Sequence, residues 1–395
     1  MFHLVLVNLG RNPLRTLLTL ASVTLALFLF CALSGVLDTL QESIKVGSET
    51  RLVTRNKVSL IFPMPKSYMQ RLQAVDGVKR VAISNWFGGT DPANPRDFFA
   101  QFAVDENYIP IYSSDVDIVE WSKLPEGVPA PAGVDPKLAV FETEQTACIV
   151  GIKLMEKRGW KLGQQVTVRG TIYPGDWTFT IRGVYKAKKK SFDESSLLFH
   201  FNYLEQKGMG GSGQVGIYIL QLSDPSRASA VASAIDGMFQ TSAPSTRTES
   251  EQAFQAGFVS MYGNLPFVLR LVGLAIVFSI LLIAANTMMV SMRERTSEFA
   301  VLKTLGFTDG AVFGMVVAEA AVITVGGGTI GALAAKFGIE RSGFNMLGFL
   351  PSMTVYWSTV FTGIGIALLI GAVSGLIPAL QASRLRIVDA LRRVE

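Results

Sequence analysis

The side chains that could carry catalysis or bind a metal ion are few in this chain of 395 residues. It contains two histidines, His3 and His200, and two cysteines, Cys31 and Cys148, which lie far apart in the sequence. Two histidines cannot build a multi-histidine metal site, and this cysteine spacing predicts neither a disulfide framework nor a thiolate metal site. With His200 as the only histidine outside the N-terminal tail, no serine, histidine and aspartate set can be argued. We therefore expect no enzyme active site.

The sequence also contains no glycine-rich motif in a context that would bind a nucleotide. The stretch GSGQVG matches the dinucleotide pattern G-x-G-x-x-G through Gly211, Gly213 and Gly216. A dinucleotide loop follows a strand and opens a helix, whereas this stretch precedes the strand predicted at 216–222, which indicates a flexible loop or a hairpin turn. The P-loop pattern G-x-x-x-x-G-K-[ST] does not occur in the sequence. We expect no cofactor in this chain.

The composition is typical of a membrane protein. Hydrophobic residues make up 49% and charged residues 17% of the chain, and the mean hydropathy is +0.36. Soluble proteins carry about 25% charged residues. The formal net charge is +5, but the basic residues cluster beside apolar runs, where anionic lipid headgroups and membrane topology explain them better than nucleic acid does. We therefore predict contact with membrane lipids and no binding of nucleic acid.

Four segments are long and apolar enough to cross a bilayer, which takes about 20 residues of helix. They cover approximately residues 14–36, 266–290, 311–335 and 354–380. The first is longer than the apolar region of a signal peptide, which has roughly 7–15 residues, so we predict a retained helix. Asn12 and Pro13 are suited to begin it.

The distribution of basic residues predicts the orientation of these helices. Basic residues precede the first helix, follow the fourth and lie between the second and third, whereas the short connection between the third and fourth has only Lys336 and Arg341. The positive-inside rule then places both termini and the 291–310 loop in the cytoplasm. The residues that carry this argument are Arg11, Arg15, Arg293, Arg295, Lys303, Arg384, Arg386, Arg392 and Arg393.

This orientation places a segment of ordinary domain size outside the cytoplasmic membrane, between the first two helices. Alternating apolar patterns predict strands at 57–62, 77–84, 164–170, 177–185, 195–201 and 216–222, and helices at 65–75 and 225–239. We therefore predict a membrane protein with four transmembrane α-helices, one plus three, and a large α+β extracytoplasmic domain inserted between helices 1 and 2. The predicted domains are 1–37, 38–264 and 265–395.

Small residues and one carboxylate lie inside the predicted transmembrane helices. Gly327 and Gly331 are four residues apart, as are Gly371 and Gly375. This spacing lets helix backbones approach closely, either within one chain or at a dimer seam, and the spacing does not separate the two. Glu319 lies about two turns from the cytoplasmic end of the third helix. An intramembrane carboxylate is costly, so we expect it either to be paired or functional or to reach the membrane interface.

A polar stretch, RERTSEFAVLKTLGF at 293–307, separates the second and third predicted transmembrane helices. Phe299, Leu302 and Leu305 fall three residues apart, with charged residues off that stripe, which predicts a short amphipathic helix at the membrane face. Gly306 is expected to end this helix. Two interpretations stay open: a surface helix that joins two spans, or a docking helix for a cytoplasmic partner.

The same stretch resembles the coupling-helix loop of MacB/FtsX-type ABC transporter permeases, whose pattern is approximately ERTREIGVLRALGAS. The resemblance continues in AANTMM through Asn286, in AEAAVITVGGGTIGAL, and in the segments VDGVKRVAIS and KRGWKLGQQVTVRG, which resemble the family's periplasmic core domain. It covers nearly the whole chain. In the loop the matching residues are Glu294, Arg295, Thr296, Glu298, Leu302, Leu305 and Gly306.

The resemblance implies a permease of the inner membrane that works as a homodimer or as a heterodimer with a paralogous permease. Its coupling helix would contact an ABC ATPase, and ATP-driven closure would move the extracytoplasmic domain, a mechanism called mechanotransmission. Because this chain has no P-loop, we expect a separate ATPase subunit that carries ATP and Mg. The residues expected to couple to the ATPase are Glu294, Arg295, Glu298, Leu302, Leu305 and Gly306, and those expected at packing or dimer contacts are Asn286, Glu319, Gly327, Gly331, Gly371 and Gly375.

Three functions fit this resemblance. The first is export or extraction of a substrate, the second is FtsX-like control of an extracytoplasmic enzyme or sensor without transport, and the third is release of lipoproteins as in LolC/E-like permeases. The sequence names no substrate. It also leaves open whether a periplasmic adaptor and an outer-membrane protein complete the system.

Overall fold

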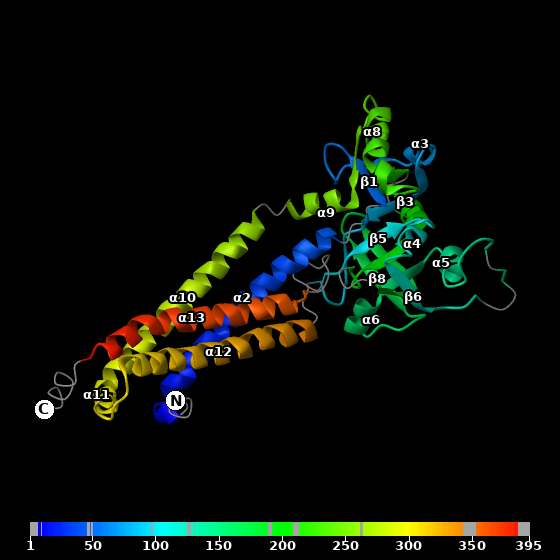
Figure 1. Ribbon diagram of the computed structural model, residues 1–395. Helices are drawn as coiled ribbons and strands as arrows, with labels where there is room; N and C mark the ends of the chain where they lie inside the picture. The colour runs from blue at the N-terminus through cyan, green and yellow to red at the C-terminus, as the bar shows by residue number, and fades with distance from the viewer. Residues whose placement is uncertain are drawn as a thin grey trace. The chain divides into compact units, whose positions relative to one another are not determined.

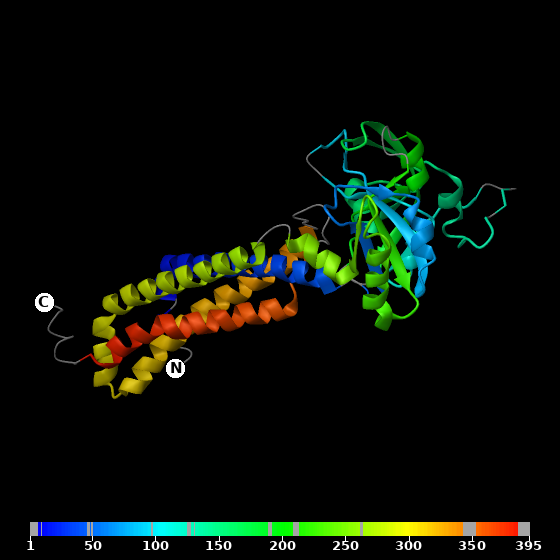
Figure 2. The same cartoon turned by 90° about the horizontal axis from the view of Figure 1, so that it is seen from above.

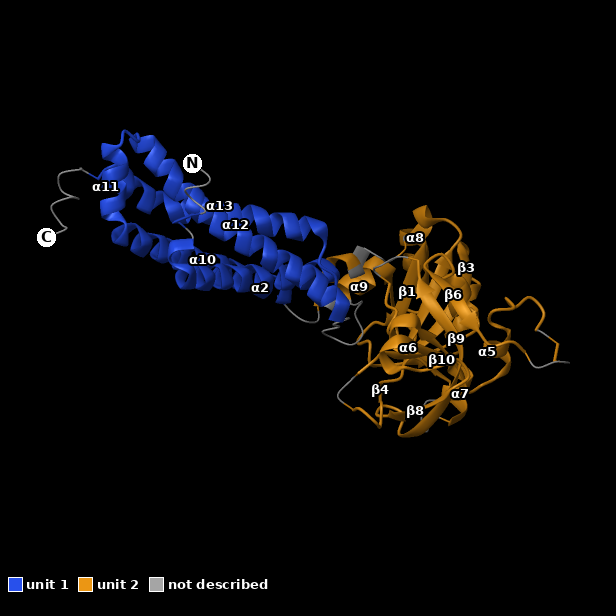
Figure 3. Cartoon of the chain, turned by 90° about the horizontal axis from the view of Figure 1, so that it is seen from below, with its two compact units in different colours: residues 1–39, 264–344, 353–395 blue, residues 40–263, 345–352 orange. Residues whose placement is uncertain are grey.

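The computed structural model describes residues 7–8, 10–45, 48, 50–95, 98–124, 128–129, 131–188, 192–207, 213–260, 264–342 and 353–385. The chain forms two compact units, which Figure 3 shows in different colours. One unit, here called the helical bundle, comprises residues 1–39, 264–344 and 353–395. The other, here called the inserted domain, comprises residues 40–263 and 345–352.

Four long apolar helices form the helical bundle, and Figures 1 and 2 show them side by side. Each is long and apolar enough to cross a membrane, which makes the chain a multi-pass membrane protein. All four predicted spans are confirmed, and the first and third helices continue beyond their predicted apolar segments. The helices are α2 (Pro13–Lys45), α10 (Leu265–Glu294), α12 (Asp309–Ser342) and α13 (Trp357–Ser383).

A short helix, α11 (Thr296–Thr304), joins α10 to α12. Arg295 both ends α10 and precedes α11. At the other end Gly306 has a φ of 95°, its N–H bonds to the Lys303 carbonyl at 3.1 Å, and the Phe307 N–H bonds to the Leu302 carbonyl at 3.1 Å. These two bonds and the left-handed glycine form a Schellman motif, which satisfies carbonyls left open at the helix end. The prediction that Gly306 terminates this helix is confirmed.

A mixed sheet forms the centre of the inserted domain, with strand order β13-β1-β12-β3-β5-β10-β7-β9-β8-β4 and β6 paired to β9 among the described residues. The β5–β10 and β7–β9 pairs are parallel, and the other pairs are antiparallel. A separate two-stranded sheet pairs β2 (Met64–Pro65) with β11 (Gln214–Val215). The strands of the large sheet are β1 (Arg51–Asn56), β3 (Val78–Trp86), β4 (Gly89–Thr90), β5 (Gln101–Val104), β6 (Val116–Trp121), β7 (Ala147–Gly151), β8 (Gln165–Gly170), β9 (Gly175–Ala187), β10 (Leu197–His200), β12 (Ile217–Leu222) and β13 (Thr246–Ser250).

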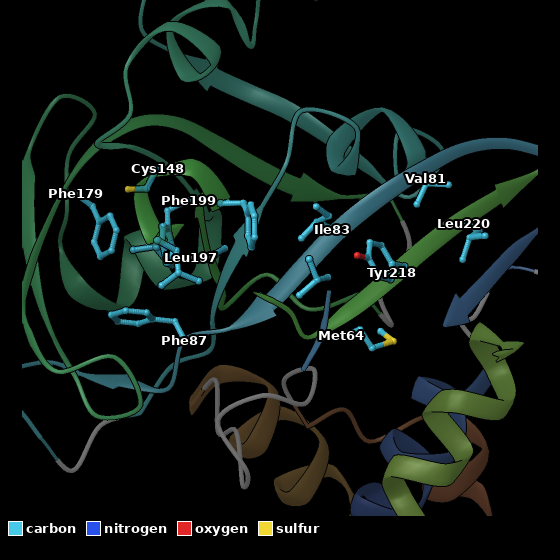
Figure 4. Packing of buried hydrophobic residues seen from close by; sticks show 14 of the residues in the cluster. Met64, Val81, Ile83, Phe87, Cys148, Phe179, Leu197, Phe199, Tyr218 and Leu220 are labelled. Carbon is cyan, nitrogen blue, oxygen red and sulfur yellow. The ribbon is translucent and has the colours of Figure 1, made fainter. Parts of the chain in front are cut away.

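Both faces of this sheet are buried, because successive residues of its central strands point to opposite faces. Val81 and Ile83 belong to one apolar cluster, whereas Ala82 belongs to a second. Figure 4 shows residues of the first cluster, in which the ring centres of Phe87 and Phe199 lie 5.3 Å apart. The helices of the domain are α3 (Tyr68–Gln73), α4 (Tyr108–Ile111), α5 (Ala139–Thr143), α6 (Ile152–Arg158), α7 (Phe201–Lys207), η1 (Pro225–Arg227), α8 (Ala228–Met238) and α9 (Glu251–Ser260).

The strand predicted at 57–62 is wrong, whereas the other strands and helices predicted for this domain are confirmed. The strand in this region is β1, which ends at Asn56. It pairs on both sides, and both partners stop there, with Arg55 opposite Ile217 and Asn56 opposite Thr246. The apolar run that follows finds no neighbouring strand and forms an exposed loop. Hydrophobicity alone therefore placed the strand too late in the chain.

Candidate functional site

A polar cavity of about 230 Å³ lies in the helical bundle, between the start of α2 and the corner formed by α10 and α11. Hydroxyl and amide side chains such as Asn12, Thr19 and Ser291 contribute to its walls. Its charged residues balance, because three are arginines and three are glutamates. These six residues are Arg11, Arg15, Glu294, Arg295, Glu298 and Glu319.

Arg295 is the inner anchor of this site. Its Nη1 lies 2.8 Å from Oε2 of Glu319, and its Nε lies 3.2 Å from Oε2 of Glu298. The guanidinium also lies 5.1 Å from the centre of the Phe299 ring, a distance that suits a cation–π contact. Of the two alternatives left open for Glu319, pairing is thus the one observed. The pair lets a carboxylate stay buried in an apolar helix, where an isolated charge would be costly.

The outer edge of the site ties the start of α2 to the α10–α11 corner. Arg11 Nη1 lies 2.8 Å from Oε1 of Glu298, so this carboxylate is shared between Arg11 and Arg295. Arg15 forms a second ion pair with Glu294 at the end of α10. Three residues expected to couple to the ATPase, Glu294, Arg295 and Glu298, therefore have partners inside this chain.

The apolar stripe predicted for α11 does not hold as one surface. Phe299 is buried in a cluster with Met292 and Val312. Leu302 is half-buried against the same cluster, whereas Leu305 is 72% exposed. The three residues are buried to different degrees because α11 packs its first turn against α10 and α12 and does not keep the same face against these helices over its whole length.

Val301 is an exposed apolar residue of α11 that the sequence pattern did not single out. It is 48% exposed and lies one helical turn before Leu305. Thr304 and Gly306 are exposed beside them. We call these four residues the α11 outer face. Val301 and Leu305 are four residues apart, a spacing that places them on the same face of a helix. The sequence interpretation followed the three-residue spacing of the predicted stripe instead and missed this face.

Lys303 fixes the end of α11, a role the sequence did not indicate. Its Nζ donates to the carbonyls of Ser383 and Leu385, at 2.5 and 3.0 Å, and lies 2.8 Å from Oδ1 of Asp309. Ser383 is the last residue of α13. Because Arg295 binds α12 and Lys303 binds the end of α13, α11 is held at both ends.

The first pair of predicted packing glycines lies where α2 crosses α12. A Cβ added to Gly331 would stand 2.3 Å from the carbonyl oxygen of Thr24, and one added to Gly327 would stand 2.9 Å from that of Leu20. Both distances are too short for any side chain, so only glycine permits this crossing. The contact is made within the chain.

The second pair lies where α13 packs on α12. A Cβ added to Gly371 would stand 2.3 Å from Oγ1 of Thr324, and one added to Gly375 would stand 3.0 Å from Cβ of Ala320. Asn286, the remaining residue expected at packing contacts, has an exposed side chain on α10. Whether it serves a contact between two copies stays a prediction.

A second buried ion network lies in the inserted domain, around Arg51 at the start of β1. Arg51 Nη1 lies 2.6 Å from Asp115 Oδ2, and its Nε lies 2.7 Å from Glu251 Oε2. Tyr112 donates its hydroxyl to the other oxygen of Glu251 at 2.7 Å. Burial by itself lowers the pKa of Arg51, but the charge of Glu251 leads the effects that outweigh it, so the pKa is raised. The network joins the strand that follows α2 to the helix that precedes α10.

Several carboxyl groups of the inserted domain hold protons more tightly than usual. Burial raises the pKa of Asp105 to about 7, although backbone amides such as that of Ile83 oppose the shift. Burial also raises the pKa of Glu142 to about 7 and that of Asp193 to about 6. The described residues include no group of three or more histidine, cysteine, aspartate or glutamate side chains placed to hold a metal ion.

The glycine-rich stretch that resembles a dinucleotide loop leads into strands. Gly213 has a φ of 74° and precedes β11, and Gly216 precedes β12 directly. Gly211 lies outside the described residues. His3 and the C-terminal arginines Arg386, Arg392 and Arg393 also lie outside them.

Two protein families match the chain. The family described as MacB-like periplasmic core domain matches residues 16–238, and the family described as FtsX-like permease C-terminal matches residues 270–387. The first match covers more than half of the chain.

Curated relatives include two ABC transporter permeases and a macrolide exporter. The permease YknZ of Bacillus subtilis is 34% identical over 110 residues, 27% of this chain and 26% of that protein. The macrolide export ATP-binding/permease protein MacB of Campylobacter fetus is 27% identical over 219 residues, 54% of this chain and 34% of that protein. The permease MJ1507 of Methanocaldococcus jannaschii is 21% identical over 413 positions, 98% of this chain and 96% of that protein. The first two matches thus span about a quarter to a third of those relatives.

The solved structures that align with about half of the chain include two extracytoplasmic domains of ABC-type transporters. The extracellular domain of YknZ covers 51% of this chain and 100% of its own, with 14% identity and a TM-score of 0.36. The periplasmic region of MacB from Actinobacillus actinomycetemcomitans covers 55% of this chain and 97% of its own, with 11% identity and a TM-score of 0.38.

Proposed function

The chain belongs to the ABC transporter permeases of MacB/FtsX type, and from this premise we propose that it couples ATP hydrolysis on a separate ATPase subunit to motion of the inserted domain. The motion serves export or extraction of a substrate, by mechanotransmission. ATP and Mg²⁺ are held by the ATPase. The working unit is a dimer, formed with a second copy or with a paralogous permease, in the inner membrane, with α11 on the cytoplasmic side and the inserted domain outside.

The observation that carries this proposal is the combination of anchoring and exposure in α11. The helix is held at both ends, by Arg295 on α12 and by Lys303 on the end of α13. It nevertheless presents the exposed apolar side chains of Val301 and Leu305. A short helix that is fixed in a bundle and exposes apolar groups is suited to receive a partner protein and to pass its displacement to the bundle.

The proposal divides the predicted coupling residues into two groups. Leu305 and Gly306 belong to the α11 outer face and contact the ATPase. Glu294, Arg295 and Glu298 position α11 from inside the bundle, because each has an ion-pair partner in this chain. Leu302 lies between these groups and packs α11 onto its neighbours.

The test is a Leu305→Glu substitution in the full-length chain, purified together with the ABC ATPase that is retained from the native membrane. Leu305 makes few internal contacts, so the fold is preserved while a charge is placed at the centre of the contact. We expect ATPase binding to fall about tenfold or more, the effect of losing a central apolar contact, and stimulation of ATP hydrolysis by the permease to fall with it.

The matched control is Val58→Glu, which places the same charge on an exposed apolar residue of the inserted domain. This variant is expected to bind and stimulate the ATPase like the parent chain. Unchanged ATPase binding and stimulation in Leu305→Glu would show that α11 is not the contact, and the proposal would fail.

A further inference from the structure

The ion pairs of the cavity differ in how deeply they are buried, and the difference follows the elements they connect. The side chains of Arg295 and Glu319, which join the α10–α11 corner to α12, are 15% and 9% exposed. Those of Arg11, which lies two residues before α2, and Glu298 of α11 are 59% and 37% exposed. Those of Arg15 and Glu294, which join α2 to α10, are 24% and 51% exposed.

This difference in burial makes the ion pair to α12 stable and the ion pairs to the start of α2 easy to separate. Separating a buried pair leaves a charge without a partner or water, which is strongly unfavourable. Separating a solvent-exposed pair costs little, because water replaces the lost contact. The α10–α11 corner is therefore fixed to α12, whereas the ion pairs that hold the start of α2 to that corner, among the residues that the structure describes, are ones that water can replace.

Resting on the proposed function, we propose that Arg11 and Arg15 are positioning residues that form a releasable clip between α2 and the α10–α11 corner. The clip is closed while α11 is free. It opens when the ATPase displaces α11, because Glu298 then leaves Arg11 and follows Arg295. The start of α2 is thereby released, and because α2 is continuous to Lys45, its displacement is carried along the chain toward β1.

Two features near the clip suit this movement. The cavity beside the clip is lined by hydroxyl groups such as those of Thr16 and Thr19. These groups form hydrogen bonds with water that enters when the ion pairs separate. Further along, the backbone of α2 rests on Gly327 and Gly331 without an intervening side chain. This close crossing holds α2 in place at Leu20 and Thr24, so the released residues before it pivot about the crossing.

The experiment measures how fast a cysteine in the cavity wall reacts with a water-soluble maleimide, in the full-length chain in lipid nanodiscs. Thr19→Cys serves as the probe, because Thr19 is 5% exposed and lines the cavity. The native cysteines are both buried, and the parent chain gives their background. Replacing both clip arginines, Arg11→Gln with Arg15→Gln, is expected to raise the labelling rate at least tenfold.

A second probe separates opening of the clip from general loosening of the bundle. Thr324→Cys lies buried between α12 and α13 and touches no part of the clip. Its labelling rate is expected to stay unchanged in the Arg11→Gln, Arg15→Gln chain. Equal acceleration at both probes, or no acceleration at Thr19→Cys, would overturn the proposal.

Charge exchange tests whether the pairs themselves hold α2. Arg15→Glu alone and Glu294→Arg alone place like charges together and are expected to accelerate labelling of Thr19→Cys. The double variant restores opposite charges and is expected to return the rate to within about twofold of the parent. If the double variant labels as fast as the single ones, the ion pair does not hold the helix.

Addition of the ATPase with a non-hydrolysable ATP analogue separates this proposal from the proposed function. Faster labelling of Thr19→Cys in the otherwise unaltered chain is expected. If the ATPase binds with the analogue, and is stimulated when ATP replaces it, but labelling stays slow, the clip is wrong and the proposed function stands. If no ATPase binds, the proposed function fails, and the charge-exchange result alone decides whether the clip exists.

Discussion

Two arginines, one in each unit of the molecule, each hold two carboxylates, but in different surroundings. Arg51 of the inserted domain is fully enclosed, and so are its partners Asp115 and Glu251. Arg295 of the helical bundle has one enclosed partner, and its other partner, Glu298, opens onto a polar cavity. The Arg51 network is thus completely buried, whereas the Arg295 network is buried on one side and faces the cavity on the other.

The difference indicates which network can change its partners. An enclosed charge has no water to replace a lost partner, so the Arg51 network behaves as a permanent joint between β1 and α9. The Arg295 network combines a permanent contact to α12 with an exchangeable one to α2. In the proposed function, the contact to α12 transmits the displacement of α11 and the contact to α2 is the one that separates.

The largest expected effect on stability follows from removing the arginine of the buried Arg51 network. Arg51→Met keeps the volume but leaves Asp115 and Glu251 buried without a cation, so we expect the inserted domain to lose about 3–5 kcal/mol of unfolding free energy. Four of the five tryptophans lie in this domain, at positions 86, 121, 160 and 177. Thermal unfolding of the full chain in non-ionic detergent, followed by tryptophan fluorescence, therefore measures the change.

The control for this variant is Arg169→Met, which removes an exposed arginine paired with the exposed Asp176. Its expected effect is about 0–1 kcal/mol. If Arg51→Met cost no more than Arg169→Met, the network would not be the rigid joint inferred from its burial.

A smaller effect is expected for the half-open network. Glu319→Gln removes the enclosed charge beside Arg295 but leaves Glu298 and the cavity to compensate, so the helical bundle is expected to lose about 1–3 kcal/mol. The loss of helix on heating, followed by circular dichroism, measures it. Asp309→Asn, which removes an exposed partner of Lys303, is the control with little expected effect. A loss in Glu319→Gln as large as that in Arg51→Met would mean that water does not enter the cavity.

The smallest effect concerns Asp105, a buried carboxyl group for which the described residues supply no ion pair like that between Glu251 and Arg51. The pKa of Asp105 is about 7 in the fold and 3.8 ordinarily. The folded state thus binds this proton more tightly than the unfolded chain, so stability falls as pH rises from 3.8 through about 7 and is constant above. The shift corresponds to roughly 4 kcal/mol, of which an amide recovers only part, because its NH2 group must also find a partner in the buried site. Asp105→Asn is therefore expected to stabilise the inserted domain at pH 8 by roughly 1–2 kcal/mol and to change it little at pH 4.

The measurement is the melting temperature of the full chain at both pH values, where each kcal/mol corresponds to about 2–4 °C for a domain of this size. Asp135→Asn, at an exposed loop position, provides the comparison. Part of the pH dependence is expected to persist in Asp105→Asn, since the pKa of Glu142 is also raised. A variant that melts like the parent at pH 8 would contradict the assignment.

Much of the architecture could be predicted from the sequence, because it rests on local patterns. A transmembrane helix needs only about 20 apolar residues in a row, and the end of α11 needs only a glycine that accepts a positive φ. The error at 57–62 shows the limit of such patterns. Whether an apolar run becomes a strand depends on neighbouring strands, and the partners of β1 come from β12 and β13, far along the chain.

The four spans, the inserted domain and the short helix between the second and third spans follow from composition and from spacing along the chain. The exposed side of α11 and the pairing of charges depend instead on how the elements pack. Arg15 and Glu294 are 279 positions apart, and Arg51 and Glu251 are 200 apart. Such pairs form only when distant helices and strands pack together, so no local pattern could reveal that Glu298 faces α2 while Leu305 faces outward.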